Sequence, residues 1–228
     1  MSKPFDATLK HLLDQHAADW LAWLCPVAGL PIPTSATPVD AELSTVSLAA
    51  DKVFQVGLPM NGFIHIEAQS SYEKEIAAKL HEYNTVIHAR HGGPVRTVII
   101  LLRRDADHPG VSGVFERKDE RGVYLRFVYS VIKVWEQSLT SLLTGPLGTL
   151  PLALLTDEAA ASVPDVLKAM GERFDKEKVA QDAVNLLWSA GYILMGLRFD
   201  RPEIVNWFKG VQGMEESTTY QWILEQGR

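Results

Sequence analysis

The amino-acid sequence predicts an α/β (α+β) fold in which a mixed central sheet is flanked by helices and followed by a helical extension. Short β-rich runs alternate with helical patterns as far as residue 135. The run VRTVIILL, residues 95–102, is almost wholly apolar and β-branched, which is typical of a strand buried on both faces. Beyond residue 135 only helical patterns recur. We therefore expect a core over residues 1–135 and an extension over residues 136–228.

The elements of the N-terminal part follow from spacing and composition. Residues 6–24 place apolar side chains at helical spacing and predict an amphipathic helix, whole or in two pieces. The proline-rich residues 25–40 predict a loop. A short strand is expected within residues 43–48. Residues 51–56 and 63–69 then predict two paired strands around a Gly–Leu–Pro–Met–Asn–Gly connection.

The second half of the chain continues this alternation and then becomes helical. Residues 71–92 predict a helix that ends near Gly92. Residues 113–135 predict a hairpin around Asp119–Gly122, with a long second strand. The apolar residues 142–155 contain prolines and glycines and predict a loop or a broken helix. Three or four helices are expected over residues 157–228.

Composition narrows the classes of protein to consider. The N-terminus is polar and no apolar run is long enough for a membrane span, so we expect no membrane insertion. The single cysteine, Cys25, favours a reducing, cytoplasmic setting. The formal net charge of −6 argues against a simple polyanion binder. However, residues 74–133 carry 11 basic and 7 acidic side chains. This region either faces a polyanion or is an ordinary solvated surface.

Two acids mark the ends of the predicted strand pair. The register that pairs Phe54 with Ile64 puts apolar side chains on one face and mixed, polar ones on the other. The same register places Asp51 opposite Glu67, about 4.5–5.5 Å away between Cβ atoms. Like charges at that distance repel, unless a cation lies between them, one of them is protonated, or the strands splay. A divalent metal is the most economical explanation, and Mg²⁺ binds to one or two protein carboxylates.

Gln69 and His65 share the face of Glu67 in this register. The amide of Gln69 can orient a ligand or water. His65 either contacts a ligand or is a packed or solvated histidine. The alternative to a metal site is a pair of solvated carboxylates on an exposed sheet face.

These residues resemble the PD-(D/E)XK nuclease superfamily, in which an acid in one strand precedes Glu/Asp-x-Lys in the next. The segments that carry the resemblance cover most of the chain and are most similar to the recombination-promoting nuclease and transposase (Rpn-like) family. They are PFDATLKHLLDQ, ELSTVSLAADKVFQV, HIEAQS, KLHEYNTVIHARHG and GMEESTTYQWILEQG. The resemblance implies a restriction-endonuclease-like α-β-β-β-α-β core. It also implies cleavage of DNA that depends on Mg²⁺ or Mn²⁺ held by Asp51 and Glu67.

The sequence departs from the superfamily at the lysine, because residue 69 is Gln. An amide supplies neither a base nor a positive charge. Lys79 and Tyr83 match the spacing of a Gln-x-x-x-Tyr motif that RecB-like members carry in the following helix. We therefore expect Lys79 to supply the missing cation and Tyr83 to support the site, the alternative being a solvated lysine and a core tyrosine. Glu42 is a further upstream acid that either assists the metal or is capping or solvated.

Two functional hypotheses follow. The first is a metal-dependent DNA endonuclease associated with transposition or recombination, with Asp51, Glu67, Gln69 and Lys79 at its catalytic site. In that case DNA is the partner, and the C-terminal helices form a homo-oligomer or bind the target. The second is a catalytically inactive relative with the same fold, acting as a DNA- or protein-binding module.

Overall fold

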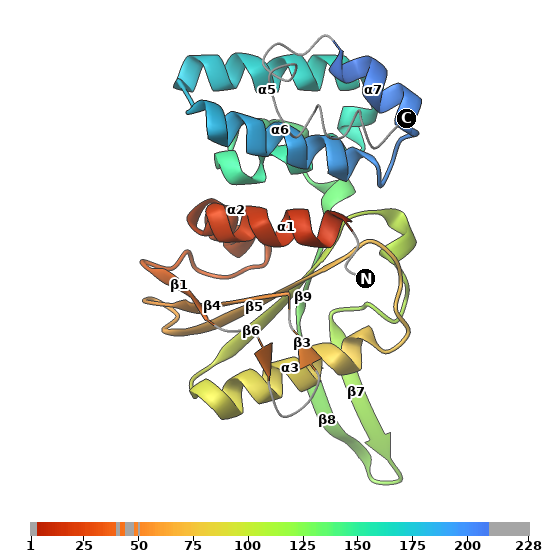
Figure 1. Cartoon of the computed structure of the whole chain (residues 1–228). Coiled ribbons are helices and arrows are strands. Elements are labelled where there is room, and N and C mark those ends of the chain that lie inside the picture. Colours follow the sequence, from red (N-terminus) through yellow and green to blue (C-terminus); the bar gives the residue numbers. More distant parts are fainter. Residues whose placement is uncertain (1–3, 40–41, 44–47, 50, 210–228) are drawn as a thin grey trace. The chain divides into compact units, whose positions relative to one another are not determined.

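The chain has the mixed α/β fold that its sequence predicts, and it divides into two compact units (Figure 1). The structure is a computed structural model that describes residues 4–39, 42–43, 48–49 and 51–209. One unit is Ala17–Lys133, which contains the sheet. The other joins Met1–His16 to Val134–Arg228. The similarity noted for residues 213–227 falls outside the described residues.

The central sheet combines antiparallel and parallel pairs. β1 pairs antiparallel with β4, and β4 with β5, whereas β5, β6 and β9 run parallel. The predicted hairpin register is confirmed, because Phe54 lies opposite Ile64. In sheet order, the strands are β1 (Ala36–Val39), β4 (Lys52–Val56), β5 (Gly62–Gln69), β6 (Val95–Leu101) and β9 (Ser130–Lys133).

Helices cover both faces of this sheet. Figure 1 shows α2 (Ala17–Val27) over one face and α3 (Ile76–His91) over the other. Tyr83 and Ile87 of α3 pack with Val53 and Phe63 of the sheet in one buried cluster. β6 is buried along its last five residues, as expected for a strand covered on both sides. The part of the polar face that carries His65 and Glu67 therefore lies beneath α3 and is buried, whereas Gln55 on the same face is exposed.

The prediction of a loop over residues 25–40 is wrong at both ends. α2 continues through Pro26 to Val27, and β1 begins at Ala36. Proline is tolerated at these places for two reasons. Pro26 lies in the last turn of its helix, where few backbone bonds remain to be broken. Pro38 lies in β1, an edge strand, where a missing N–H leaves no neighbouring strand unpaired.

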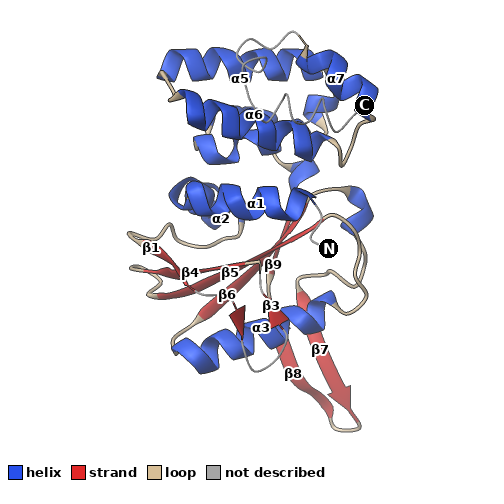
Figure 2. Ribbon diagram, viewed as in Figure 1, coloured by secondary structure: helices blue, strands red, loops and turns tan. Residues whose placement is uncertain are grey.

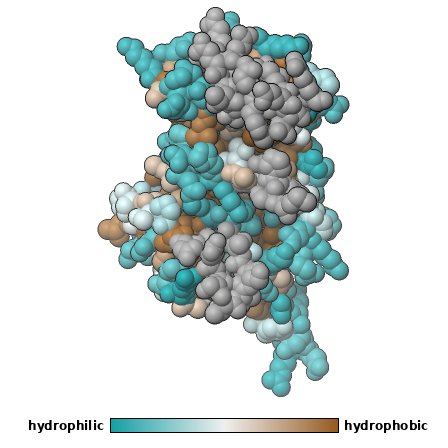
Figure 3. Space-filling model, in the orientation of Figure 1, coloured by the Kyte–Doolittle hydropathy of each residue, from teal (hydrophilic) through white to brown (hydrophobic). Residues whose placement is uncertain are grey.

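A second hairpin extends from the same unit. β7 (Val114–Asp119) and β8 (Gly122–Val128) form a two-stranded sheet that runs beyond α3 (Figure 1) and is largely hydrophilic at its end (Figure 3). The predicted long second strand is instead two strands, since β9 leaves the hairpin and joins the central sheet. The strand expected within residues 43–48 is part of a small pair, β2 (Glu42–Leu43) and β3 (Leu48–Ala49), and residues 44–47 lie outside the described part.

The other unit is built from helices (Figure 2). α1 (Pro4–Gln15) contacts α6 (Gln181–Met195) and a 3₁₀ helix, η3 (Leu147–Leu155), so its buried leucines belong with the C-terminal part of the chain. α1 therefore belongs to the helical unit, whereas the division expected from the sequence grouped residues 1–135 together. The remaining helices are α4 (Leu139–Thr144), α5 (Val163–Glu177) and α7 (Arg201–Phe208). Within the described residues, none of the helices has the length and apolar character needed to cross a bilayer.

Candidate functional site

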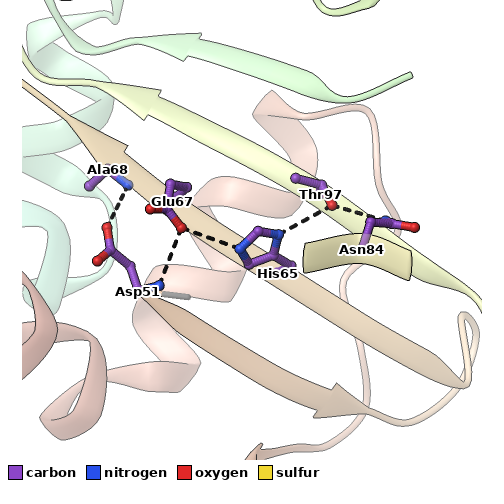
Figure 4. A network of polar contacts seen from close by, with 6 residues as sticks. All are labelled: Asp51, His65, Glu67, Ala68, Asn84 and Thr97. Carbon is purple, nitrogen blue, oxygen red and sulfur yellow. Dashed lines mark hydrogen bonds and ion pairs between the residues drawn. The ribbon is translucent and has the colours of Figure 1, made fainter. Parts of the chain in front are cut away.

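A series of hydrogen-bonded polar side chains crosses the α3 face of the sheet (Figure 4). Asn84 Nδ2 lies 3.0 Å from Thr97 Oγ1, and Thr97 Oγ1 lies 3.3 Å from His65 Nδ1. His65 Nε2 lies 3.3 Å from Glu67 Oε2, which also accepts a 3.2 Å hydrogen bond from the backbone N–H of Asp51. The members come from three strands or strand ends and one helix, so only the folded sheet unit brings them together.

The two predicted acids do meet, although not as a regular strand pair. β4 begins at Lys52, and Asp51 lies in a bend before it. From there, Asp51 Oδ2 accepts a 3.0 Å hydrogen bond from the backbone N–H of Ala68, beside Glu67. Each carboxylate thus accepts a backbone N–H from the segment that carries the other. These reciprocal bonds hold the acids together and offset part of the repulsion between them.

Glu67 is buried, with 7% of its surface exposed. This burial raises the pKa of Glu67, and the nearby charge of Asp51 raises it further. The hydrogen bonds from His65 and from the backbone of Asp51 oppose the shift. The alternative of two solvated carboxylates on an open sheet face is therefore wrong for Glu67. A buried acid with perturbed ionisation and a charged neighbour is typical of functional sites.

Tyr83 closes the site on the helix side. Its ring packs edge-on against the imidazole of His65, with centroids 5.4 Å apart. Burial, followed by the charges of Glu67 and Asp51, raises the pKa of Tyr83 to about 12. Tyr83 therefore keeps its proton at neutral pH, and its 7% exposure makes it a core residue as well as a neighbour of the site.

The three remaining predicted site residues, Gln69, Lys79 and Glu42, lie in β5, α3 and β2. Gln69 is half-buried at the last position of β5, two residues beyond Glu67. The ammonium group of Lys79 binds to the carboxylate of Glu73, and both side chains are about two-fifths exposed. Glu42 begins β2, and its side chain lies outside the described residues.

Thr97 and Asn84 were not predicted to belong to the site. The signal for Thr97 was present, because it is a hydroxyl residue inside the apolar run of β6 and pairs with His65 across the sheet. Asn84 carried no such signal, since α3 has polar residues all along its exposed side. Its amide is placed by tertiary packing, which brings α3 over β6.

Two loops lie beyond the site, at the carboxyl ends of the parallel strands. The loop after β5 is tied to the loop after β6, because Arg103 Nε donates to the carbonyl of Ser70 at 2.7 Å. Tyr72 N–H donates to the carbonyl of Asp105 at 2.8 Å, and the ring of Tyr72 stacks on His108. Ligands of open α/β sheets commonly bind outside the carboxyl ends of the strands.

The donor set suits a cation that needs few protein ligands. No group of three or more His, Cys, Asp or Glu side chains among the described residues is arranged to hold a metal. Zinc sites usually need three or four such ligands, whereas Mg²⁺ retains waters and binds through one or two carboxylates. Asp51 and Glu67 are fewer ligands than a zinc site requires, and they could hold only a cation, such as Mg²⁺, that keeps most of its waters.

Comparison of the chain with models of protein families, with curated proteins and with solved structures finds no match in any of the three. The functional interpretation therefore depends on the site itself.

Proposed function

We propose that the sheet unit is a restriction-endonuclease-like domain that cleaves DNA phosphodiesters with a divalent cation at Asp51 and Glu67. One observation carries the proposal. A buried glutamate with a raised pKa is bonded to the segment of a second acid, near the carboxyl end of a central strand. Carboxylates gathered in this way destabilise a fold unless they serve a cation or a proton.

The order of elements supports the proposal. In the sheet unit, α2 is followed by β1, by the small separate pair β2–β3, and by β4 and β5, then by α3 and β6. Of these, β1, β4 and β5 form the antiparallel part of the central sheet, and β6 runs parallel to β5. The superfamily resemblance implies an α-β-β-β-α-β core, with one acid early in one strand and the second acid in the next strand of a hairpin. Asp51 precedes β4 and Glu67 lies in β5, which are the corresponding positions.

The residues of the chain would divide the work in a simple way. Asp51 and Glu67 would hold the cation, which when bound supplies Lewis-acid activation of a phosphodiester and of water. Gln69 would orient a water or a phosphate oxygen through its amide. Lys79 would contribute positive charge, because an exposed ion pair such as Lys79–Glu73 is worth about 0–1 kcal/mol and can be exchanged for a phosphate contact.

DNA is the partner that the charge distribution favours. The excess of basic residues between 74 and 133 lies within the sheet unit, on a chain whose net charge is −6. Arg117, Lys118, Arg121 and Arg126 are exposed on the β7–β8 hairpin. Binding through such residues would weaken steeply as salt increases.

A plasmid-nicking assay tests the proposal. The whole chain is incubated with supercoiled plasmid and Mg²⁺ or Mn²⁺, beside Asp51→Ala, Glu67→Ala and the control Glu172→Ala. Glu172 is an exposed acid paired with Lys168 on α5. We expect metal-dependent nicking that each site variant lowers at least about 100-fold, because even loss of an outer-shell partner costs 10–100-fold. Equal nicking by all four proteins would refute the assignment.

An inactive DNA- or protein-binding relative is the second candidate. The observation that favours it is Gln69, which stands where the superfamily pattern has a lysine. This candidate predicts salt-sensitive DNA binding, or capture of a protein partner, with no nicking under any metal. Homo-oligomer formation through the C-terminal helices is a separate proposal, and light scattering of the whole chain tests it.

A further inference from the structure

The imidazole of His65 is the most buried polar group at the candidate site, with none of its surface exposed. It stands between two hydrogen-bonding partners, Thr97 on β6 and Glu67 on its own strand. A valine or isoleucine at this position would pack in the sheet without any polar group to satisfy. Burial of polar side chains costs free energy unless each of them is hydrogen-bonded. Packing alone therefore does not explain why four polar side chains are hydrogen-bonded in a row here.

The direction of the hydrogen bonds in this series follows from Asn84, the residue at its first end. Asn84 Nδ2 is 3.0 Å from the carbonyl oxygen of Val95 and 3.0 Å from Thr97 Oγ1. Because the carbonyl of Val95 can only accept, the atom of Asn84 that faces it must be the amide nitrogen. The second hydrogen of that nitrogen then points to Thr97. The hydroxyl of Thr97 accepts this bond and keeps its single proton for another partner.

The same reasoning continues to Glu67. A carboxylate that binds a cation is ionised and only accepts hydrogen bonds, so in that state the nitrogen of His65 that faces Glu67, Nε2, carries the proton. In the neutral ring, Nδ1 is then an acceptor, and Thr97 donates to it. The four side chains form one directed series from Asn84 through Thr97 and His65 to Glu67 (Figure 4).

We infer that His65 is a positioning residue, which Thr97 and Asn84 hold in one orientation so that its Nε2–H fixes the carboxylate of Glu67. The inference rests on the proposed function in one respect, since the carboxylate is fixed for a cation. Outer-shell groups that orient a ligating carboxylate restrict its rotation and make its oxygens available on one side. Glu67 is fixed at Oε2, the oxygen that also accepts from Asp51 N–H.

The test compares two changes at Thr97 in the whole chain, one that keeps the shape of the side chain and one that keeps its hydroxyl. Thr97→Val removes the hydroxyl and keeps the shape, whereas Thr97→Ser keeps the hydroxyl. The first measurement is the two-bond ¹H–¹⁵N spectrum of the histidine rings at pH 8, without metal and with Mg²⁺, because a bound cation keeps Glu67 ionised. The signals of His65 among the seven histidines are those that disappear in His65→Gln. We expect a pure Nε2–H form in the wild type and in Thr97→Ser, and a mixture of tautomers in Thr97→Val.

The second measurement is Mn²⁺ affinity by electron paramagnetic resonance, which needs no DNA cleavage. We expect Thr97→Val and His65→Phe to weaken Mn²⁺ binding about 10–100-fold. His65→Gln, which can place an amide N–H near the same carboxylate, should restore much of that loss. Thr97→Ser should stay within about threefold of the wild type. Circular dichroism checks that each variant is folded.

The outcomes separate this inference from the proposed function. If Thr97→Val leaves both the ring spectrum and Mn²⁺ affinity unchanged, or if the wild-type ring carries its proton on Nδ1, the positioning role is wrong. If the wild type binds no Mn²⁺, the proposed function fails and the positioning of Glu67 for a cation fails with it. In that case the ring spectrum still shows whether the directed series exists. Loss of nicking in Thr97→Val with unchanged Mn²⁺ affinity also contradicts the inference.

Discussion

At the scale of single residues, Glu67 is the side chain of the candidate site whose burial lowers the stability of the fold most clearly. Its carboxylate is buried beneath α3 and beside a second acid, and both circumstances disfavour the ionised form. His65 and the backbone of Asp51 compensate in part through hydrogen bonds. A residue kept in this state lowers the stability of the metal-free protein, as is common where binding groups are gathered in advance.

Glu67→Gln should therefore stabilise the metal-free protein while abolishing cation binding. The folded-state pKa of Glu67 is raised, so the glutamate weakens the fold progressively as pH rises above about 4.5, its usual value. The advantage of the glutamine variant should thus be absent at pH 4 and present at pH 8. Each kcal/mol corresponds to about 2–4 °C in the unfolding midpoint of a chain this size. Calorimetry of both proteins at the two pH values is the measurement, and a lower midpoint for the variant at pH 8 would contradict it.

Lys79→Ala should reduce DNA nicking by about 100- to 1,000-fold, the range typical of removing one group that stabilises developing charge. Its stability should change by less than about 1 kcal/mol, because the Lys79–Glu73 pair is half-exposed. Lys74→Ala is a matched control from the preceding loop. Plasmid nicking and thermal unfolding measured together separate the two effects. Unchanged nicking would show that the ammonium group is not used.

At the scale of elements, α3 does more than cover the sheet. Tyr83 and Asn84 bring an aromatic edge and an amide to the site, and His81 packs against Phe115 and Phe127 of the β7–β8 hairpin. An isolated two-stranded hairpin is at best marginally stable in water, so this contact with α3 is what anchors it. One helix thus contacts both the site and the exposed hairpin.

In the helical unit, Arg198 joins the segment after α6 to the end of η3. Its Nη1 donates to the carbonyls of Leu155 and Thr156, each at 2.7 Å, and Nη2 binds to Asp157. Arg198→Ala should cost about 1–3 kcal/mol, since two backbone acceptors lose a charged donor. Arg198→Lys should recover only part, because an ammonium group cannot match this planar fork. Urea unfolding is the measurement, and Lys168→Ala, which removes an exposed pair, should stay within about 0.5 kcal/mol.

At the scale of the whole molecule, the helical unit is formed from two segments that are separate in sequence. Met1–His16 cluster with Val134–Arg228, and the sheet unit is inserted between them in sequence. Leu9, Leu12 and Leu13 are almost fully buried, and α1 contacts α6 and η3. The helical unit is therefore assembled from both ends of the described chain.

Removal of residues 1–16 should destabilise helices that are more than a hundred residues away in sequence. Burial of each leucine is worth about 1.5–3 kcal/mol, so the loss of three is comparable with the stability of a whole domain, about 5–15 kcal/mol. Limited proteolysis should then cut α5 and α6 before it cuts the sheet strands. A quadruple change of Lys3, Asp6, Lys10 and Asp14 to Ala removes the same charged side chains as the truncation and controls for their loss. Equal protection of both units in the truncated chain would contradict the prediction.

Local pattern was sufficient for much of the sheet unit. The alternation of Phe54, Ile64 and Ile66 fixes which side chains share a face, and the observed register follows it. The sequence pattern gave a wrong prediction where the effect of a proline depends on its place in the fold. Pro38 is compatible with a strand because β1 lies at the edge of the sheet. The pattern also could not assign α1 to a unit, because an amphipathic stripe shows that a helix is packed without showing against what.

For the candidate site, the sequence by itself determined that Asp51 and Glu67 come together, since strand periodicity and a short connection leave few registers. Tertiary structure alone decided that Glu67 is buried, that His65 lies between it and Thr97, and that Lys79 binds to Glu73. The physical reason is that periodicity reports only which side chains share a face. What covers that face, and with which polar groups, depends on the packing of α3 and β6, which are distant in sequence from β4.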